Sequence, residues 1–205
     1  MAETTIDTAF SAIQSAFNNC ADFNARRIVF GDGKTGYLLN IGSYTDRDYI
    51  SESIVSPLLK AGRSPLSKNE VFSLITSSEL SEIIGVEDAI SKLLSGFAII
   101  MIEIENGYSI FCCQVRMVSS RSTSEPESEV VLKGPREGFI ESSEDNLALL
   151  RKRLKTTKFK AERLTIGEFT DTTVYICYIA VHSNMNFFFM MMTSYQKAKY
   201  AHNLS

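Results

Sequence analysis

The residues whose types could do chemistry gather in one short basic cluster. Seven Lys and Arg side chains fall within thirteen residues: Arg151, Lys152, Arg153, Lys155, Lys158, Lys160 and Arg163. With Phe159 among them, such a cluster could bind the phosphates of a nucleic acid. It could also face anionic lipid headgroups, with the Phe- and Met-rich segment after residue 184 lying in the membrane surface.

The charge of the rest of the chain argues against nucleic acid as a partner. The formal net charge is -3 and the pI is about 5.5, so no basic field surrounds the whole protein. The acids Glu125, Glu127 and Glu129 alternate before the cluster, which places them on one face of an extended segment. We therefore expect the basic cluster to be a solvated face or a contact between parts of the protein. Binding of nucleic acid or of an anionic membrane surface remains the alternative.

Residues typical of an enzyme are scarce. His occurs only at positions 182 and 202, and the four cysteines lack a C-x-x-C spacing. Gly33-Lys34-Thr35 matches the end of a phosphate-binding loop, but the required Gly five positions earlier is Ile28. We predict a protein without catalytic residues, cofactor or metal, with reduced and mostly buried thiols. Residues 31–35 are then a hairpin turn.

The basic cluster begins inside a helix whose start and end are marked in the sequence. Gly134-Pro135 and Gly138 favour a turn, and Ser142 with Asp145 approximates a capping box. Leu147, Leu150 and Leu154 recur at spacings of three and four, so they form an apolar stripe. The basic residues from Arg151 to Lys155 fall in the last turn, where the helix dipole favours positive charge.

Hydrophobic periodicity predicts the other elements. Helices are expected at 8–18, 46–60, 68–76 and 86–94, and strands at 25–30, 36–41, 98–102, 109–115, 161–169 and 172–181. Pro57 should end or kink the second helix, because it lacks a backbone N–H.

These elements predict an α/β protein built from two small α/β subdomains with mixed sheets, the second of them incomplete. The N-terminal α/β subdomain should span residues 6–117. A Ser-rich linker covers 118–128, and the partial second subdomain covers 129–205.

One long stretch resembles a known family. Residues 125–155, EPESEVVLKGPREGFIESSEDNLALLRKRLK, with Ile166-Gly167 and the strand 172–176, resemble the soluble N-terminal region of the A-subunit (GerA) family of bacterial spore germination receptors. Asp22-Phe23, Arg26 and Pro57-Leu58 are similar as well. The resemblance covers roughly residues 8 to 183, and the tail from about 184 lies outside it.

The resemblance implies a non-enzymatic component of a complex in the inner spore membrane, with this region on the cytoplasmic side. Such complexes respond to small nutrients, and the nutrient site is expected chiefly on the B subunit. The partners implied are other receptor subunits and further copies of the chain itself. The role implied for this region is receptor assembly or signal relay.

The resemblance also implies a set of contact residues between subdomains or subunits. Within it, Arg136 and Arg151 are expected to pair with acids or backbone carbonyls, because Arg forms bonds of fixed geometry. The set is Gly134, Pro135, Arg136, Glu137, Gly138, Phe139, Asn146, Leu150 and Arg151.

The sequence shows neither a signal peptide nor an apolar run of about eighteen residues that could span a bilayer. Because the family continues into a membrane region, we expect a truncated, non-signalling member that would be cytoplasmic by itself. Its last twenty residues would then come from a shifted reading frame.

Overall fold

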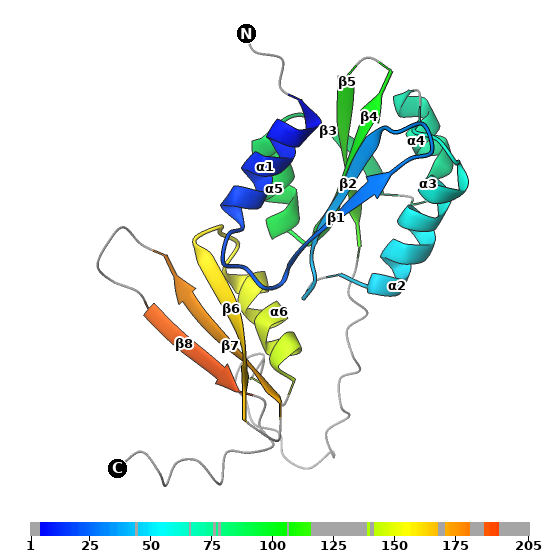
Figure 1. Ribbon diagram of the computed structural model, residues 1–205. Coiled ribbons are helices and arrows are strands. Elements are labelled where there is room, and N and C mark those ends of the chain that lie inside the picture. The colour runs from blue at the N-terminus through cyan, green and yellow to red at the C-terminus, as the bar shows by residue number, and fades with distance from the viewer. Residues whose placement is uncertain are drawn as a thin grey trace, which may run out of the picture.

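The computed structural model describes residues 5–43, 45–65, 67–75, 77, 79–105, 107–115, 139, 142–167 and 171–180, and the backbone of 187–192. Within these residues the chain forms two β-sheets, each with helices packed against it (Figure 1). The expected α/β class with two subdomains is confirmed.

The first sheet has five strands in the order β1-β2-β4-β5-β3. Its strands are β1 (Phe23–Val29), β2 (Thr35–Ile41), β3 (Leu80–Ile83), β4 (Phe97–Ile104) and β5 (Gly107–Gln114). The hairpins β1-β2 and β4-β5 are those that the sequence predicts, and β2 pairs with β4 to join them.

Helices cover both faces of this sheet (Figure 1). The helices α1 (Ile6–Ala16) and α5 (Val86–Leu94) pack on one face. The other face carries α2 (Arg47–Ile50), η1 (Ser51–Val55), α3 (Ser56–Lys60) and α4 (Lys68–Leu74). Ser67 accepts a hydrogen bond from the Glu70 N–H and caps the start of α4.

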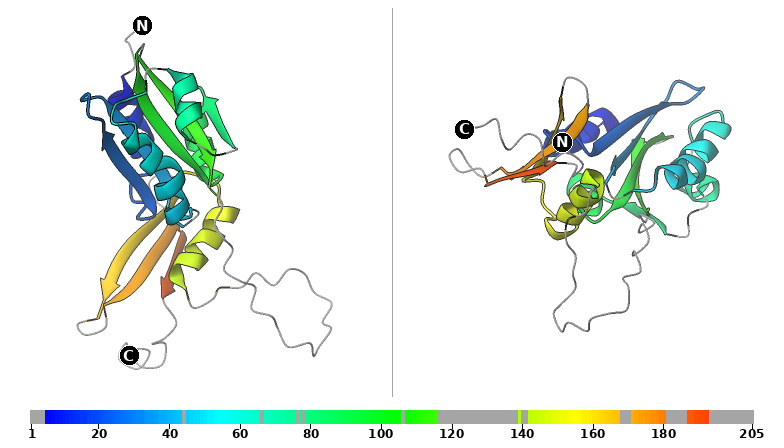
Figure 2. Two further views of the ribbon diagram at one scale, coloured as in Figure 1. Left: turned by 90° about the vertical axis from the view of Figure 1, so that its right-hand side faces the viewer. Right: turned by 90° about the horizontal axis from the view of Figure 1, so that it is seen from below.

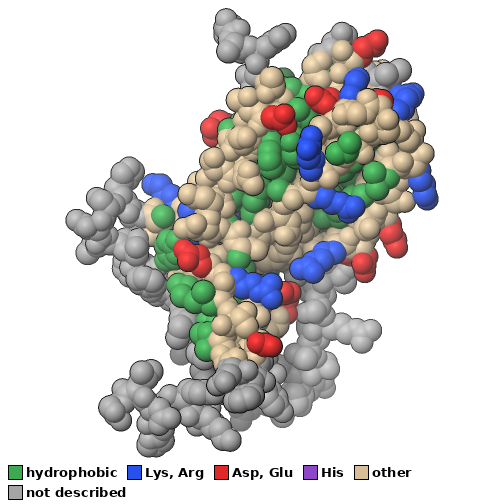
Figure 3. All heavy atoms as spheres, in the orientation of Figure 1, with side chains coloured by type: hydrophobic (Ala, Val, Ile, Leu, Met, Phe, Trp, Pro, Cys, Tyr) green, Lys and Arg blue, Asp and Glu red, His purple; other side chains and the backbone are tan. Residues whose placement is uncertain are grey.

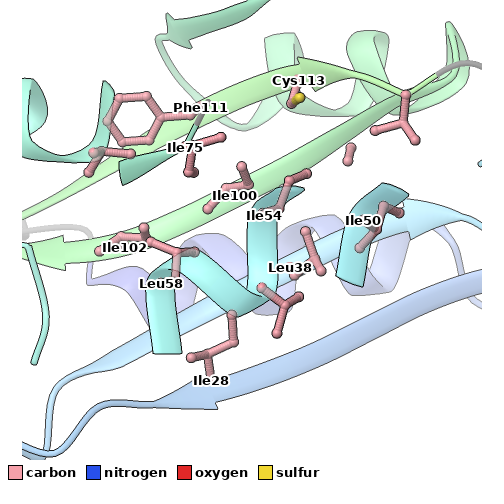
Figure 4. Packing of buried hydrophobic residues seen from close by; sticks show 14 of the residues in the cluster. Ile28, Leu38, Ile50, Ile54, Leu58, Ile75, Ile100, Ile102, Phe111 and Cys113 are labelled. Carbon is pink, nitrogen blue, oxygen red and sulfur yellow. The ribbon is translucent and has the colours of Figure 1, made fainter. Parts of the chain in front are cut away.

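The core explains why β4 reads as a continuous apolar run. Successive strand residues point to opposite faces, so Ile100 and Ile102 pack under α2 to α4 while Ile99 and Met101 pack under α1 and α5. Figure 4 shows the first of these two layers, in which Ile54 lies close to the sheet.

The helix expected at 46–60 contains an irregular segment. In η1 the Ser56 N–H bonds to the carbonyl of Ser51, five residues back, which is the spacing of a π-helix. Pro57 follows directly and has no N–H to give to the carbonyl of Ser53. The proline therefore alters the hydrogen bonding of this helix without ending it.

The second sheet has the order β6-β7-β8, with β6 (Phe159–Ile166), β7 (Thr172–Ile179) and β8 (Phe187–Met192). Helix α6 (Ser143–Arg153) packs on it through Leu147, which is buried with Phe159, Tyr175 and Cys177. Figure 2 shows this smaller unit beside the end of the five-stranded sheet.

Three details differ from the expectations. All strand pairs among the described residues are antiparallel, where mixed sheets were expected, and parallel pairing there is limited to the isolated bridge between Cys20 and Ala161. Strand β3 was not predicted, because its four residues show no strong alternation. Strand β8 lies in the tail for which no regular period was found. The proposed linker 118–128 lies outside the described residues, so the domain limits stay predictions.

Candidate functional site

Helix α6 places Arg151 at the boundary between the two subdomains. Ser142 caps the helix by accepting a hydrogen bond from the Asp145 N–H at 3.2 Å, as its sequence predicts. Leu147 and Arg151 are one helical turn apart and therefore share the buried face of α6. Arg151 is only 1% exposed.

The guanidinium of Arg151 binds an acid from the N-terminal subdomain. Its Nε donates to Asp22 Oδ2 at 2.9 Å and its Nη2 donates to Asp22 Oδ1 at 2.7 Å. Its Nη1 donates to the carbonyl of Phe159 at 3.0 Å. The two parallel bonds to one carboxylate are the fork geometry that Arg favours. The ion pair thus joins two residues that lie 129 positions apart in the sequence.

Asp22 is fixed in place by its own subdomain. It lies in the connection between α1 and β1 and is 7% exposed. Ser43 donates its hydroxyl to Asp22 Oδ2 at 3.2 Å, and the Gly42 N–H donates to the Asp22 carbonyl at 2.6 Å. The carboxylate therefore meets Arg151 with little freedom to reorient.

Burial by itself would lower the pKa of Arg151. The hydrogen bonds and the negative charge of Asp22 outweigh this effect and raise the pKa of Arg151 above its usual value. Arg151 therefore keeps the positive charge that arginine carries in proteins. Nearby, burial raises the pKa of the Cys177 thiol to about 12, so this thiol is neutral.

Backbone hydrogen bonds attach the same connection to the second sheet. The Ala21 N–H donates to the Ala161 carbonyl at 2.7 Å, and the Ala161 N–H donates to the Asn19 carbonyl at 3.1 Å. Cys20 and Ala161 form a parallel bridge, so the connection extends the β6 edge of the second sheet. Figure 1 shows β6 and α6 beside the chain that links α1 to β1.

Lys160 supports the contact from the other side of β6. Its Nζ donates to the Ala16 carbonyl at 3.2 Å and to Asn18 Oδ1 at 2.6 Å. An ammonium group beside the last carbonyls of α1 is favourable for the helix dipole. Burial lowers the pKa of Lys160, and the positive charge of Arg151 lowers it further.

We call this set of residues the subdomain contact: Cys20, Asp22, Ser43, Arg151, Lys160 and Ala161. A cavity of about 120 Å³ lies next to it. Ligand pockets usually have about 300–1,000 Å³, so this cavity suits a few water molecules better than a substrate. Its lining comes from both subdomains: Ala21, Asp22, Asn24, Gly42, Ser43, Arg47, Glu144, Leu147, Arg163 and Tyr175.

The structure places the expected contact residues differently. Arg151 lies in the subdomain contact, and Asn146 on the same helix is buried. Leu150 packs against the core of the second subdomain. Phe139 is exposed, and the turn residues Gly134, Pro135, Arg136, Glu137 and Gly138 lie outside the described residues.

Sequence reasoning missed Lys160, Cys20 and Ser43 as contact residues. The neighbours Phe159 and Ala161 are apolar, which would normally place Lys160 on a solvated face of the strand. The end of α1 covers that face, and no local pattern shows this. Burial of Arg151 and Lys160 also removes two cations from the surface that a nucleic acid or a membrane would need.

The fold matches that of one class of solved structures. The N-terminal domain of the A subunit of the Bacillus megaterium spore germinant receptor GerK3 has a crystal structure that superposes with a TM-score of 0.61. The two share 21% identity over 89% of this chain and 67% of that one. At this identity the likeness concerns the fold alone.

Sequence comparison gives the family. Residues 11–195 match the model of the Bacillus/Clostridium GerA spore germination protein, and the chain belongs to that family. Spore germination protein B1 of Bacillus subtilis is 29% identical over 74% of this chain and 32% of its own length. Spore germination protein XA of Bacillus anthracis is 34% identical over 56% of this chain and 22% of its own length.

The family match continues to residue 195, beyond residue 183, where the resemblance was expected to end, and it includes β8. The chain spans less than a third of the length of these two curated relatives. In the part of the chain that the structure describes, no helix is long and apolar enough to cross a membrane.

Proposed function

We propose that this region belongs to the A subunit of a spore germinant receptor and acts there, without enzymatic activity, in assembly and signal relay. The observation that carries the proposal is the buried Asp22–Arg151 ion pair, which connects the two subdomains. Family membership supports the setting, and the proposal concerns the whole protein that contains this region.

The physical basis of the relay is the energy of the ion pair. Removing one partner of a buried pair typically costs about 3–5 kcal/mol, because the other charge is left without compensation. A movement that parted the two side chains while either of them stayed buried would carry a cost of this kind. The subdomains therefore keep one arrangement until a partner subunit or a signal stabilises another.

In this proposal the receptor lies in the inner spore membrane with this region on the cytoplasmic side. Its partners are other receptor subunits and further copies of the A subunit. Membrane fractionation of spores, with an antibody raised against residues 6–115, tests this placement. We expect the protein in the membrane fraction, together with other subunits after gentle detergent extraction. Recovery only from the soluble fraction would contradict it.

The turn with Gly134, Pro135, Arg136, Glu137, Gly138 and Phe139 is proposed as a second contact, to another subunit. Phe139, the one residue of this set that the structure describes, is exposed and therefore accessible to a partner. In a full-length family member, Arg136→Ala and Phe139→Ala should reduce co-purification of the subunits and slow germination. Normal assembly and germination of both variants would exclude the turn from the function.

A further inference from the structure

A groove runs along the open edge of the first sheet, and none of its lining residues belongs to the subdomain contact. Strand β1 is one of the two edge strands in the strand order. The groove lies between β1 and the helical segment from η1 to α3, and its volume is about 370 Å³. Its lining residues are Arg26, Ser51, Val55, Ser56, Leu59 and Lys60.

The backbone of β1 presents unused hydrogen-bonding groups to this groove. Backbone hydrogen bonds cross the hairpin at both ends. The Gly42 N–H donates to the Asp22 carbonyl, and the Phe30 N–H donates to the Lys34 carbonyl. Hydrogen-bonded and non-hydrogen-bonded residue pairs alternate along two antiparallel strands. The even-numbered residues of β1 therefore form the backbone hydrogen bonds to β2. The odd-numbered residues Ala25, Arg27 and Val29 therefore direct their N–H and C=O groups outward. Within the described residues, no backbone hydrogen bond occupies these groups.

One stripe of the helical segment faces the groove. Ser51, Val55, Ser56, Leu59 and Lys60 recur at spacings of about four, so they form one stripe of the helix. Together with Arg26 of β1, this stripe lines the groove. Leu59 is 48% exposed there, although it is a large apolar side chain. The stripe includes both ends of η1, and π-helical turns are frequent at functional sites.

The charge of the groove is positive. Arg26 comes from the strand side and Lys60 from the helix side. Neither belongs to the ion pairs found in the described parts of the chain, which are Arg63–Glu70, Lys68–Glu82 and Arg151–Asp22. Figure 3 shows Lys and Arg side chains over the region of β1, with hydrophobic side chains between them.

The two edges of the sheet differ in how they are protected. The edge strand β3 has only four residues, and its Glu82 forms an ion pair with Lys68. Short edge strands with charged side chains discourage pairing with another chain. Strand β1 has seven residues in continuous register with β2, and it contains neither Pro nor Gly. Its charged residues, Arg26 and Arg27, would repel a basic strand, so this longer edge is suited to accept an acidic strand.

We propose that an extended acidic segment of a partner polypeptide binds along β1, under the helix stripe, and adds a sixth strand to the sheet. The backbone groups of Ala25, Arg27 and Val29 supply the pairing, and Arg26 and Lys60 attract its carboxylates. A second copy of this chain is a poor occupant through its own β1. Antiparallel pairing of two β1 strands would bring the arginines of both copies together. A flat lipid surface would leave the open backbone groups unpaired.

The test uses the whole 205-residue chain, labelled for NMR, and a capped nine-residue peptide of alternating Glu and Thr. We expect the peptide to shift the amide signals of Ala25, Arg27 and Val29 and to slow their exchange with solvent. The same peptide N-methylated at every residue should not bind, because it cannot donate backbone hydrogen bonds. Equal binding of the methylated peptide would refute strand addition.

Charge-reversal variants test the role of the two cations. Arg26→Glu/Lys60→Glu should weaken peptide binding by roughly tenfold or more, since it replaces two attractions by repulsions. Lys155→Glu/Lys158→Glu changes the net charge equally on the other subdomain and should leave binding unchanged. Equal effects of both pairs would show a general charge effect and overturn the proposal.

Two further outcomes would also overturn it. In the first, anionic phosphatidylglycerol vesicles bind the chain through Arg26 and Lys60 while the peptide does not. In the second, the β1 amide signals shift with protein concentration alone, which would identify a second copy as the occupant. None of these results depends on the Asp22–Arg151 pair. Failure of strand addition would therefore not contradict the proposed function, and failure of the proposed function would not contradict strand addition.

Discussion

Substitution of Arg151 by Met should be among the most destabilising single changes in the second subdomain. Met is similar in length but cannot form the three hydrogen bonds that Arg151 makes to Asp22 and to the Phe159 carbonyl. The Asp22 carboxylate would stay buried, with the Ser43 hydroxyl as its main remaining partner. Loss of one partner of a buried pair predicts a decrease of about 3–5 kcal/mol in the free energy of unfolding.

Urea unfolding followed by circular dichroism measures this change. Arg63→Met is the matched control, because it removes the same type of side chain from the ion pair with Glu70, in which Arg63 is 47% exposed. Exposed pairs contribute at most about 1 kcal/mol, so the control should be close to the wild type. If Arg151→Met destabilises the chain no more than Arg63→Met does, the buried pair is not the main stabilising element of the contact.

A double variant tests the reason for the loss. In Asp22→Asn/Arg151→Met the buried carboxylate is replaced by a neutral amide, so no uncompensated charge remains. The double variant should be more stable than Arg151→Met alone, because neutral groups are less costly to bury than an unpaired charge. A double variant that is less stable than both single variants would contradict this explanation.

Three other predictions follow from the structure. In urea unfolding, Ile54→Ala should lower the free energy of unfolding by about 2–5 kcal/mol, because Ile54 is fully buried. Leu59→Ala, on the same helical segment, should lower it by less than about 0.5 kcal/mol, because Leu59 is exposed. Gly31→Ala should lower stability more than Gly33→Asn. A Cβ at position 31 would collide with the Gly62 carbonyl oxygen, whereas position 33 has open space and a φ of +82°, which Asn adopts more readily than other side chains. Between pH 9 and 12 the free energy of unfolding should fall by about 1.4 kcal/mol per pH unit through titration of the Cys177 thiol alone. The thiol has a usual pKa of 9.0 that folding raises to about 12, so the folded state binds more protons there, and Cys177→Ala should reduce the slope.

The hairpins and most helices could be predicted because their signals are local. The alternation in 36–41, the Gly85 start of α5 and the Ser142 cap of α6 depend on residues close in sequence. The antiparallel arrangement could not be read in this way, since it depends on which strands become neighbours. Strand β3 is set by its pairing with β5 and not by its own four residues.

The subdomain contact shows the same limit. The helix around Arg151 is evident from the sequence, and pairing with an acid is the ordinary expectation for an arginine in such a place. That the acid is Asp22 depends on a contact between residues 129 positions apart. The burial of Lys160 likewise depends on the end of α1, which no pattern near residue 160 reveals.

Germination of spores that carry Arg151→Lys at the matching position of a full-length family member tests the central claim most directly. Lys keeps the positive charge but cannot bind both carboxylate oxygens of Asp22 in the fork geometry. At a normal amount of A subunit on an immunoblot, we predict that the response to nutrients is strongly slowed, whereas Arg63→Lys responds as the wild type does. Wild-type germination with Arg151→Lys would contradict the proposed relay through the Asp22–Arg151 pair.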